Sequence, residues 1–264
     1  MSIGNFGFHP AYAVSGLLVG ILVGMTGVGG GSLMTPLLVL FFGFHPTTAV
    51  GTDLLFAAAT KSVGTTIHSA GKTIDWAIVR RLAAGSVPAT ILCLGGMAYA
   101  GATSKGVTEL ISIVLGASLL LSALSLLFKE QILQAIGRRY PEFGATSSTR
   151  LTILTGVVLG VLVCLSSVGA GALGTIALII LYPRLPMVRI VGSDIAHAVP
   201  LTLLAGAGHW LLGTINFPLL GMLLIGSIPG IIIGSLTARY APEALLKAGL
   251  GIILAIVGLR MLAK

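Results

Sequence analysis

Charged residues are scarce in this sequence. Of its 264 residues, only 8% are Asp, Glu, Lys or Arg, whereas a soluble domain has about 25% charged residues. So few charges cannot cover a water-facing surface, which excludes a soluble globular protein. A disordered chain is excluded as well, because that class combines low hydrophobicity with high net charge.

Cysteines and known catalytic motifs are also scarce or absent. The two cysteines, Cys93 and Cys164, each lie inside an apolar stretch, and they match neither a metal-binding spacing nor a disulfide framework. The sequence has no HExxH motif, no Ser/His/Asp set and no paired-cysteine motif, which argues against an enzyme. We therefore predict no catalytic residues, no metal site and no cofactor.

Hydrophobic residues are abundant instead. They make up 56% of the chain, and the mean hydropathy is +1.07, which indicates an all-α polytopic membrane protein. Because a helix needs about 20 residues to cross the hydrocarbon core, two of the apolar segments are too short to cross alone. The apolar segments run over 11–27, 32–43 (short), 49–67, 75–100, 106–127, 151–166, 172–182 (short), 190–208, 218–238 and 244–262.

The net charge of +8 comes from 15 basic residues against 7 acidic ones. Most basic residues stand between apolar segments, where they act as topology signals. We therefore expect a lipid bilayer as partner and no nucleic acid. The first ten residues contain neither Lys nor Arg. Since a cleavable signal peptide begins with a basic region, we expect the first apolar segment to be retained.

The chain contains two copies of one unit. At an offset of 140, residues 15–35 match residues 155–175 at nine of 21 positions. One inserted residue changes the offset to 141, at which Gly51-Thr52-Asp53 aligns with Gly192-Ser193-Asp194. Such polar matches in one register identify an internal repeat. We divide the chain into a first transmembrane repeat (1–127), a cytoplasmic linker with a short amphipathic helix (128–150) and a second transmembrane repeat (151–264).

Equivalent loops of the two copies carry opposite charge bias. The 44–48 loop has no basic residue and its equivalent, 183–189, has two, while 68–81 has three and its equivalent, 209–222, has none. By the positive-inside rule, equivalent loops then lie on opposite sides of the membrane. This predicts two inverted-topology repeats, each with a Gly-broken helical hairpin and three full transmembrane helices. The total is eight to ten spans, with both termini outside.

A glycine-rich break precedes each undersized segment. Backbone that leaves a helix inside a membrane is tolerated only where protein or a watery cavity satisfies its polar groups. Inverted-repeat transporters bind substrate there, with half-helix N-termini directed at anionic groups. A tight hairpin or small-residue packing is the alternative. We predict that both breaks form one site for a small anion, comprising Thr26, Gly29, Gly30, Gly31, Ser32, Ser166, Ser167, Gly169, Ala170 and Gly171.

Other repeated small residues have a structural interpretation. Gly16 and Gly20 align with Gly156 and Gly160 and form GxxxG spacings, which predict close helix packing. A proline at position 88, repeated at 229, lies inside a predicted helix. It is either a hinge for rocking or a static kink.

Several motifs resemble those of a known family. They are GxGGGxLxxPLL from Gly27 to Leu38, GTDL at 51–54, GxGxLG at 169–174 and GSxPG at 226–230. In this order and spacing they resemble the sulfite exporter TauE/SafE family of bacterial membrane permeases over nearly the whole chain. The resemblance implies secondary transport of small sulfur-containing anions or organosulfonates. The second copy departs from the first, with Ala170 in place of Gly30 and Ile176 in place of Pro36, so the two halves of a pocket would be chemically unequal.

A few ionisable residues lie within the apolar segments, where they are costly and usually functional. Asp53 and Asp194 occupy matched positions and are either ion-coupling residues or helix caps. Lys61 either attracts the anion, pairs with an aspartate, or snorkels to the interface. His197 follows Asp194 by three residues, so the two form either a proton relay or a structural hydrogen bond. We expect His209 and its equivalent, residue 68, at the membrane interfaces.

Together these features predict a secondary transporter in the bacterial inner membrane. It would move a small anion, namely sulfite, another sulfur oxyanion or an organosulfonate, by alternating access, with a proton or cation as the coupling ion. An anion channel or a small-carboxylate permease on the same scaffold is the alternative. The sequence does not determine the oligomeric state.

Overall fold

The computed structural model describes residues 10–26, 31–70, 73–128, 131, 145–237 and 243–263. Regular structure within these ranges is helical throughout, without a strand, which confirms the all-α prediction. Five of the described helices are long and apolar enough to cross a membrane. They are α4 (Trp76–Ala100), α5 (Lys105–Leu127), α7 (Ala145–Ser166, counted from Ser147), α9 (Met187–Leu211) and α10 (Phe217–Thr237).

The remaining helices complete two similar series. The first half begins with α1 (Pro10–Thr26), α2 (Gly31–Leu40) and α3 (Pro46–Ala70), and the second half contains α8 (Ala172–Leu181) and ends with α11 (Glu243–Leu262). In each half a ten-residue helix, α2 or α8, follows a break, and a 25-residue helix, α3 or α9, comes next. The undersized segments predicted from the sequence are therefore short helices. Helix α7 begins inside the segment predicted as a linker, and that linker's amphipathic helix lies outside the described residues.

Helix contacts between the halves are reciprocal. Helix α1 packs most extensively on α10, and its counterpart α7 packs on α4, the counterpart of α10. Helix α3 packs on α9 and α5 on α11, so each of these helices meets its own equivalent. Such isologous contacts are those of two units related by a two-fold pseudo-axis.

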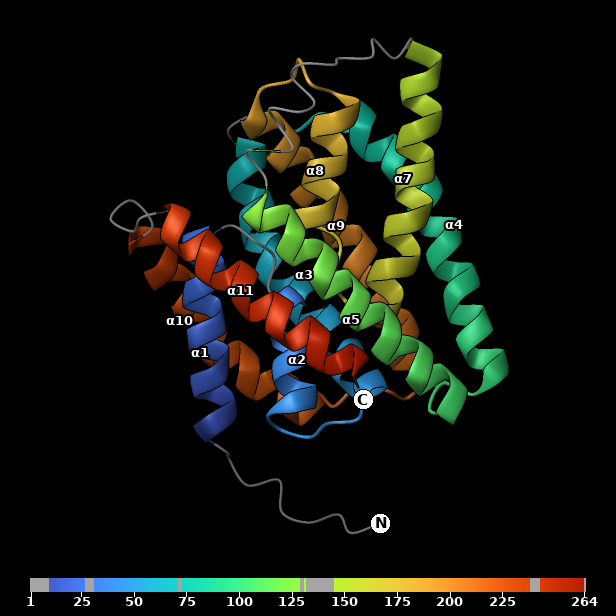
Figure 1. Ribbon diagram of the computed structural model, residues 1–264, viewed down its shortest axis with the longest axis vertical. Coiled ribbons are helices and arrows are strands. Elements are labelled where there is room, and N and C mark those ends of the chain that lie inside the picture. The colour runs from blue at the N-terminus through green and yellow to red at the C-terminus, as the bar shows by residue number, and fades with distance from the viewer. Residues whose placement is uncertain are drawn as a thin grey trace.

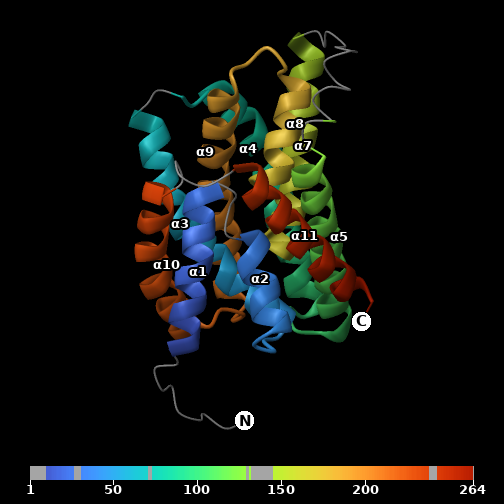
Figure 2. The ribbon, with the colours of Figure 1, turned by 60° about the vertical axis from the view of Figure 1, so that its left-hand side comes forward.

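The two halves also run in opposite directions. In Figures 1 and 2, α1 rises from the N-terminus at the bottom, whereas α7 begins at the top. Helices α4 and α9 also begin in the upper part of Figure 2. The first two turns of α4, α7 and α9 contain basic residues, among them Arg80, Arg150 and Arg189. This clustering fits the predicted cytoplasmic side and an inverted repeat, while the orientation in a membrane stays a prediction.

Glycines hold the paired helices close together. A Cβ added at Gly16 would lie 2.2 Å from the carbonyl oxygen of Leu223, and one added at Gly156 would lie 2.2 Å from that of Leu82. Gly20 and Gly160 meet the backbones of the two equivalent serines, Ser227 and Ser86, in the same way. These close approaches confirm the predicted packing role of the GxxxG spacings. The repeated prolines lie within the continuous helices α4 and α10.

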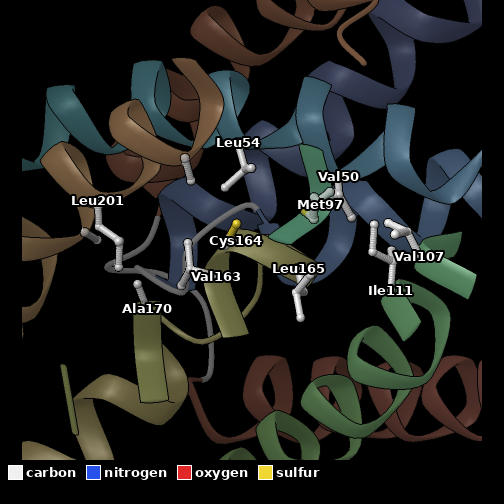
Figure 3. Packing of buried hydrophobic residues seen from close by; sticks show 12 residues of the cluster. Val50, Leu54, Met97, Val107, Ile111, Val163, Cys164, Leu165, Ala170 and Leu201 are labelled. Carbon is white, nitrogen blue, oxygen red and sulfur yellow. The ribbon is translucent and has the colours of Figure 1, made fainter. Parts of the chain in front are cut away.

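Polar residues are concentrated inside the helix assembly. Large apolar side chains lie on its outside, for example along α10 and α11, as lipid contact requires. The largest apolar cluster joins α3, α4, α5, α7 and α9 around the end of α7, and Figure 3 shows it from close by. It includes Val50, Leu54, Met97, Ile111, Val163, Cys164, Ala170 and Leu201. The break after α7 is thus enclosed by protein.

Candidate functional site

Asp53 bonds to the short helix of its own repeat. It is the eighth residue of α3, and its side chain is fully buried. The Thr35 hydroxyl on α2 donates a hydrogen bond to Asp53 Oδ2. The other carboxylate oxygen, Oδ1, is buried without a hydrogen-bond partner.

Asp194 repeats this arrangement in the second half. It is the eighth residue of α9 and is buried, and Thr175 Oγ1 on α8 donates to its Oδ2 across 3.0 Å. The backbone N–H of Gly171, at the start of α8, also bonds to this carboxylate, whose Oδ1 again lacks a partner. Of the two alternatives for the aspartates, capping of their own helices is therefore not what the structure shows. Each carboxylate instead binds the short helix that follows the break, because that helix end offers donors inside the protein.

Lys61 lies between the two halves of the site. Its side chain is only 7% exposed, and Nζ donates to the carbonyl oxygen of Ala170 across 3.0 Å. Its charge interacts with the carboxylates of both Asp53 and Asp194. The snorkelling interpretation is therefore wrong, because the buried ammonium group donates to an internal carbonyl and interacts electrostatically with two buried carboxylates. Thr202 stands at the equivalent position of the other repeat, so the site has one lysine for two aspartates.

The break after α7 brings backbone polar groups to this site. Helix α7 ends at Ser166, and Ser167 (φ 58°), Gly169 (φ 134°) and Gly171 (φ 125°) all have left-handed backbone conformations before α8 begins. Ser166 Oγ bonds the carbonyl oxygens of Leu162 and Val168. The buried Ser167 hydroxyl faces the Asp53 carboxylate but forms no hydrogen bond of ordinary geometry. A non-glycine residue with positive φ is uncommon and often functional.

The break of the first repeat is only partly described. Helix α1 ends at Thr26 and α2 begins at Gly31, on either side of the predicted break. Gly29 and Gly30 lie outside the described residues, as do the side chains of Thr26 and Ser32.

His197 has a different partner from the one expected. Its Nε2 bonds the Ser86 hydroxyl on α4 at 2.8 Å, and its Nδ1 is buried without a hydrogen-bond partner. The side chain therefore makes a structural hydrogen bond across the repeats and no direct bond to Asp194. Its ring is near enough to Lys61 to interact with that charge.

His209 lies in the last turn of α9, and its place at the membrane interface stays a prediction. The side chain is fully buried, with Nδ1 2.9 Å from Thr214 Oγ1 and Nε2 donating to the Cys164 carbonyl at 3.1 Å. The side chain of residue 68 lies outside the described part of the chain. Polar partners from α7 and from the end of α9 satisfy the imidazole, so it does not need water.

The residues beside the two aspartates tie the repeats to each other. The Ser193 hydroxyl accepts the backbone N–H of Asp75 at 2.8 Å, and the Thr52 hydroxyl accepts that of the equivalent Asn216 at 3.1 Å. In each Gly-Thr/Ser-Asp motif, the hydroxyl thus bonds the opposite repeat. The carboxylate bonds the short helix of the same repeat. At one end only, Arg189 adds an ion pair to Asp75 at 3.2 Å.

Sequence reasoning missed three contributors to this site. Thr35, Thr175 and Ser86 hold the aspartates and the histidine, yet none was singled out. A signal was present, since Thr35 and Thr175 are identical at the repeat offset. No group of three or more His, Cys, Asp and Glu side chains able to hold a metal ion occurs among the residues placed by the structure.

An all-helical fold with apolar outer faces and a buried, charged centre defines a multi-pass membrane transport protein. The family model described as "Sulfite exporter TauE/SafE" matches residues 12–261, and the chain belongs to this family. It is 42% identical over 234 residues to the "Probable membrane transporter protein YjnA" of Bacillus subtilis (strain 168), covering 87% of this chain and 91% of that one. It is 28% identical over 245 residues to the "Probable membrane transporter protein YdhB" of the same organism, covering 93% and 96%. The family and these relatives are transporters and not enzymes. No solved structure significantly matches the chain.

Proposed function

We propose that this protein is a secondary transporter for a small anion in the bacterial inner membrane. The substrate is sulfite, another sulfur oxyanion or an organosulfonate, as the family's description suggests. Transport follows alternating access, with one repeat moving against the other. The observation that carries the proposal is Lys61, a buried ammonium group that bonds the break of the other repeat and interacts electrostatically with the equivalent aspartates of both repeats.

The anion binds at Lys61 and the break after α7. Nζ of Lys61 bonds the Ala170 carbonyl, so an entering oxyanion would exchange that neutral acceptor for a charged one, which forms a stronger hydrogen bond. The Ser167 hydroxyl is buried and has no hydrogen-bond partner, so it is available as a second donor. The start of α8 adds backbone N–H groups and the positive end of a helix dipole.

Coupling to protons follows from the charges of the site. With Asp53 and Asp194 ionised and Lys61 protonated, the three residues have a net charge of −1, since two negative charges oppose one positive. Binding of a monoanion would bring the net charge of the site to −2 inside the protein, where an uncompensated charge is costly. A proton taken up by either carboxylate restores the balance. Anion and proton therefore bind together, and the direction of coupling is symport.

The experiment is flux into proteoliposomes that contain the purified protein. Uptake is measured for sulfite, sulfate, thiosulfate, sulfoacetate and small carboxylates, each with and without an inward proton gradient. We expect saturable uptake of at least one sulfur anion that increases with the gradient. Saturable uptake of carboxylates alone would replace the sulfur assignment with a small-carboxylate permease.

A channel on the same scaffold is the competing function. It would give uptake that does not saturate, with no exchange of internal for external substrate. The buried hydrogen bonds that close the centre argue for a carrier, because each of them has to break and reform as the anion passes.

A further inference from the structure

The only two cysteines of the chain meet at the contact between α4 and α7. Cys93 on α4 is half-buried and Cys164 on α7 is buried. Their thiols interact with each other, and Cys93 packs against the apolar cluster that contains Cys164. Figure 3 shows Cys164 in this cluster between Val163 and Leu165.

The register of the two helices independently brings these residues together. Gly156 packs on the backbone of Leu82, and Gly160, four residues on, packs on that of Ser86. Thr90, after four more residues, donates its hydroxyl to the Gly160 carbonyl at 3.2 Å. Cys93 lies one turn beyond Thr90 on the same face of α4, and Cys164 one turn beyond Gly160 on α7.

The equivalent contact in the other half supports this pairing. At the repeat offsets, Cys164 corresponds to Gly24 on α1 and Cys93 to Gly234 on α10. A Cβ added at Gly24 would lie 3.1 Å from the carbonyl carbon of Gly234. One half thus closes this contact with two glycines, while the other half places both thiols there.

We propose that Cys93 and Cys164 form a redox-sensitive site, which a peroxide oxidises to a disulfide that links the two repeats and stops transport. One thiolate attacks hydrogen peroxide, giving a sulfenic acid and releasing one water. The second thiol then displaces a second water from the sulfenic sulfur and forms the S–S bond. The two thiols lose two electrons and two protons, which reduce the peroxide to the two waters. A small thiol reverses the reaction by disulfide exchange.

The link would act on the site through α7. Cys164 stands two residues before Ser166, where the break begins, and its carbonyl accepts the hydrogen bond from His209 on α9. Helix α4 belongs to the first repeat and α7 to the second, so the disulfide crosses between the parts that move. This consequence rests on the proposed alternating-access function, whereas formation of the disulfide does not.

The first test is a count of reactive thiols in the purified, membrane-extracted protein. The protein is treated with hydrogen peroxide, the peroxide is quenched, and the protein is denatured. It is then labelled with a maleimide, and its intact mass is measured. We expect two labels on reduced protein, none after oxidation, and two again after dithiothreitol. The disulfide should also raise the melting temperature, because it constrains the unfolded chain. Two labels after oxidation would overturn the proposal. Disulfides that form only between protein molecules would overturn it as well.

The second test is anion uptake by the same samples in proteoliposomes. Peroxide should reduce uptake at least tenfold and dithiothreitol should restore it, while Cys93→Ser and Cys164→Ser, measured separately, should transport with or without peroxide. Unchanged uptake by protein shown to hold the disulfide would overturn the regulatory role. If no tested anion is taken up by reduced protein, the proposed function fails, and the thiol count and melting shift still decide whether the site exists.

Discussion

Lys61 Nζ on α3 of the first repeat donates a hydrogen bond of 3.0 Å to the carbonyl oxygen of Ala170 in the break of the second repeat. A buried ammonium group therefore holds the centre of one repeat to the interrupted backbone of the other. The same charge interacts with Asp53 and Asp194. In the proposed alternating-access mechanism, movement of either repeat would change the surroundings of Lys61, as coupling requires.

Replacing Lys61 tests the binding role directly. Lys61→Met keeps the length and apolar stem of the side chain but removes the charge, and we expect uptake to fall below one tenth of the original. Loss of one partner from a buried charge set costs about 3–5 kcal/mol, so folding is checked by thermal shift and gel filtration. Lys61→Met combined with Asp194→Asn removes one charge of each sign. We expect this double variant to be more stable to unfolding than Lys61→Met alone and still not to transport.

Asp53→Asn and Asp194→Asn test coupling. Each amide keeps the shape of the carboxyl group but cannot exchange a proton, so we expect uptake by the double variant that no longer increases with an inward proton gradient. Asp75→Asn is the matched control, because the chain itself has Asn216 at the position equivalent to Asp75. Gradient-dependent uptake by the double variant would leave these carboxylates a structural role only.

Thr35→Val and Thr175→Val test the symmetry of the site. Each change removes the hydroxyl donor of one buried carboxylate, which makes its ionised form less stable by about 1–3 kcal/mol. Both variants should therefore take up protons with the anion at higher pH than the unmodified protein. Thr155→Val on α7, whose hydroxyl bonds only its own helix, serves as control. A shift in one variant alone would mean that the two aspartates are not equivalent in transport.

Gly171 tests the break. Its φ of 125° is unfavourable for any residue with a Cβ, so Gly171→Val should cost about 1–3 kcal/mol and abolish uptake by distorting the start of α8. Gly95→Val on α4 is the control, since a Cβ there meets nothing within 4 Å. Normal uptake by Gly171→Val would exclude the break from the substrate site. The sequence makes the same prediction for Gly30.

The duplication made much of the fold predictable. Low charge and long apolar segments indicated the class of protein, and the glycine cluster before 172–182 located the break after α7 within a residue or two. The GxxxG spacings predicted close helix packing, because only glycine fits where two helix backbones approach this closely. Such features depend on local chain properties that a sequence displays directly.

The partners of the polar side chains could not be predicted in the same way. Asp53 was compatible with capping its own helix, and only the position of α2 beside α3 shows that it bonds Thr35 instead. His209 stands near a helix end, which suggests exposure, yet α7 covers it. Lys61 could reach either solvent or the interior by length alone. These outcomes depend on which helices pack together, and that information is spread over the whole chain.

Proton movement driven by the anion is the most direct test of coupling at the Lys61 site. Proteoliposomes with a trapped pH indicator are given an inward gradient of the anion found in the uptake screen, with no initial pH gradient. We expect internal acidification with the unmodified protein and with Asp75→Asn. We expect no acidification with Lys61→Met or with the Asp53→Asn, Asp194→Asn double variant. Saturable anion uptake without acidification, or acidification that survives in the double variant, would contradict the proposed coupling.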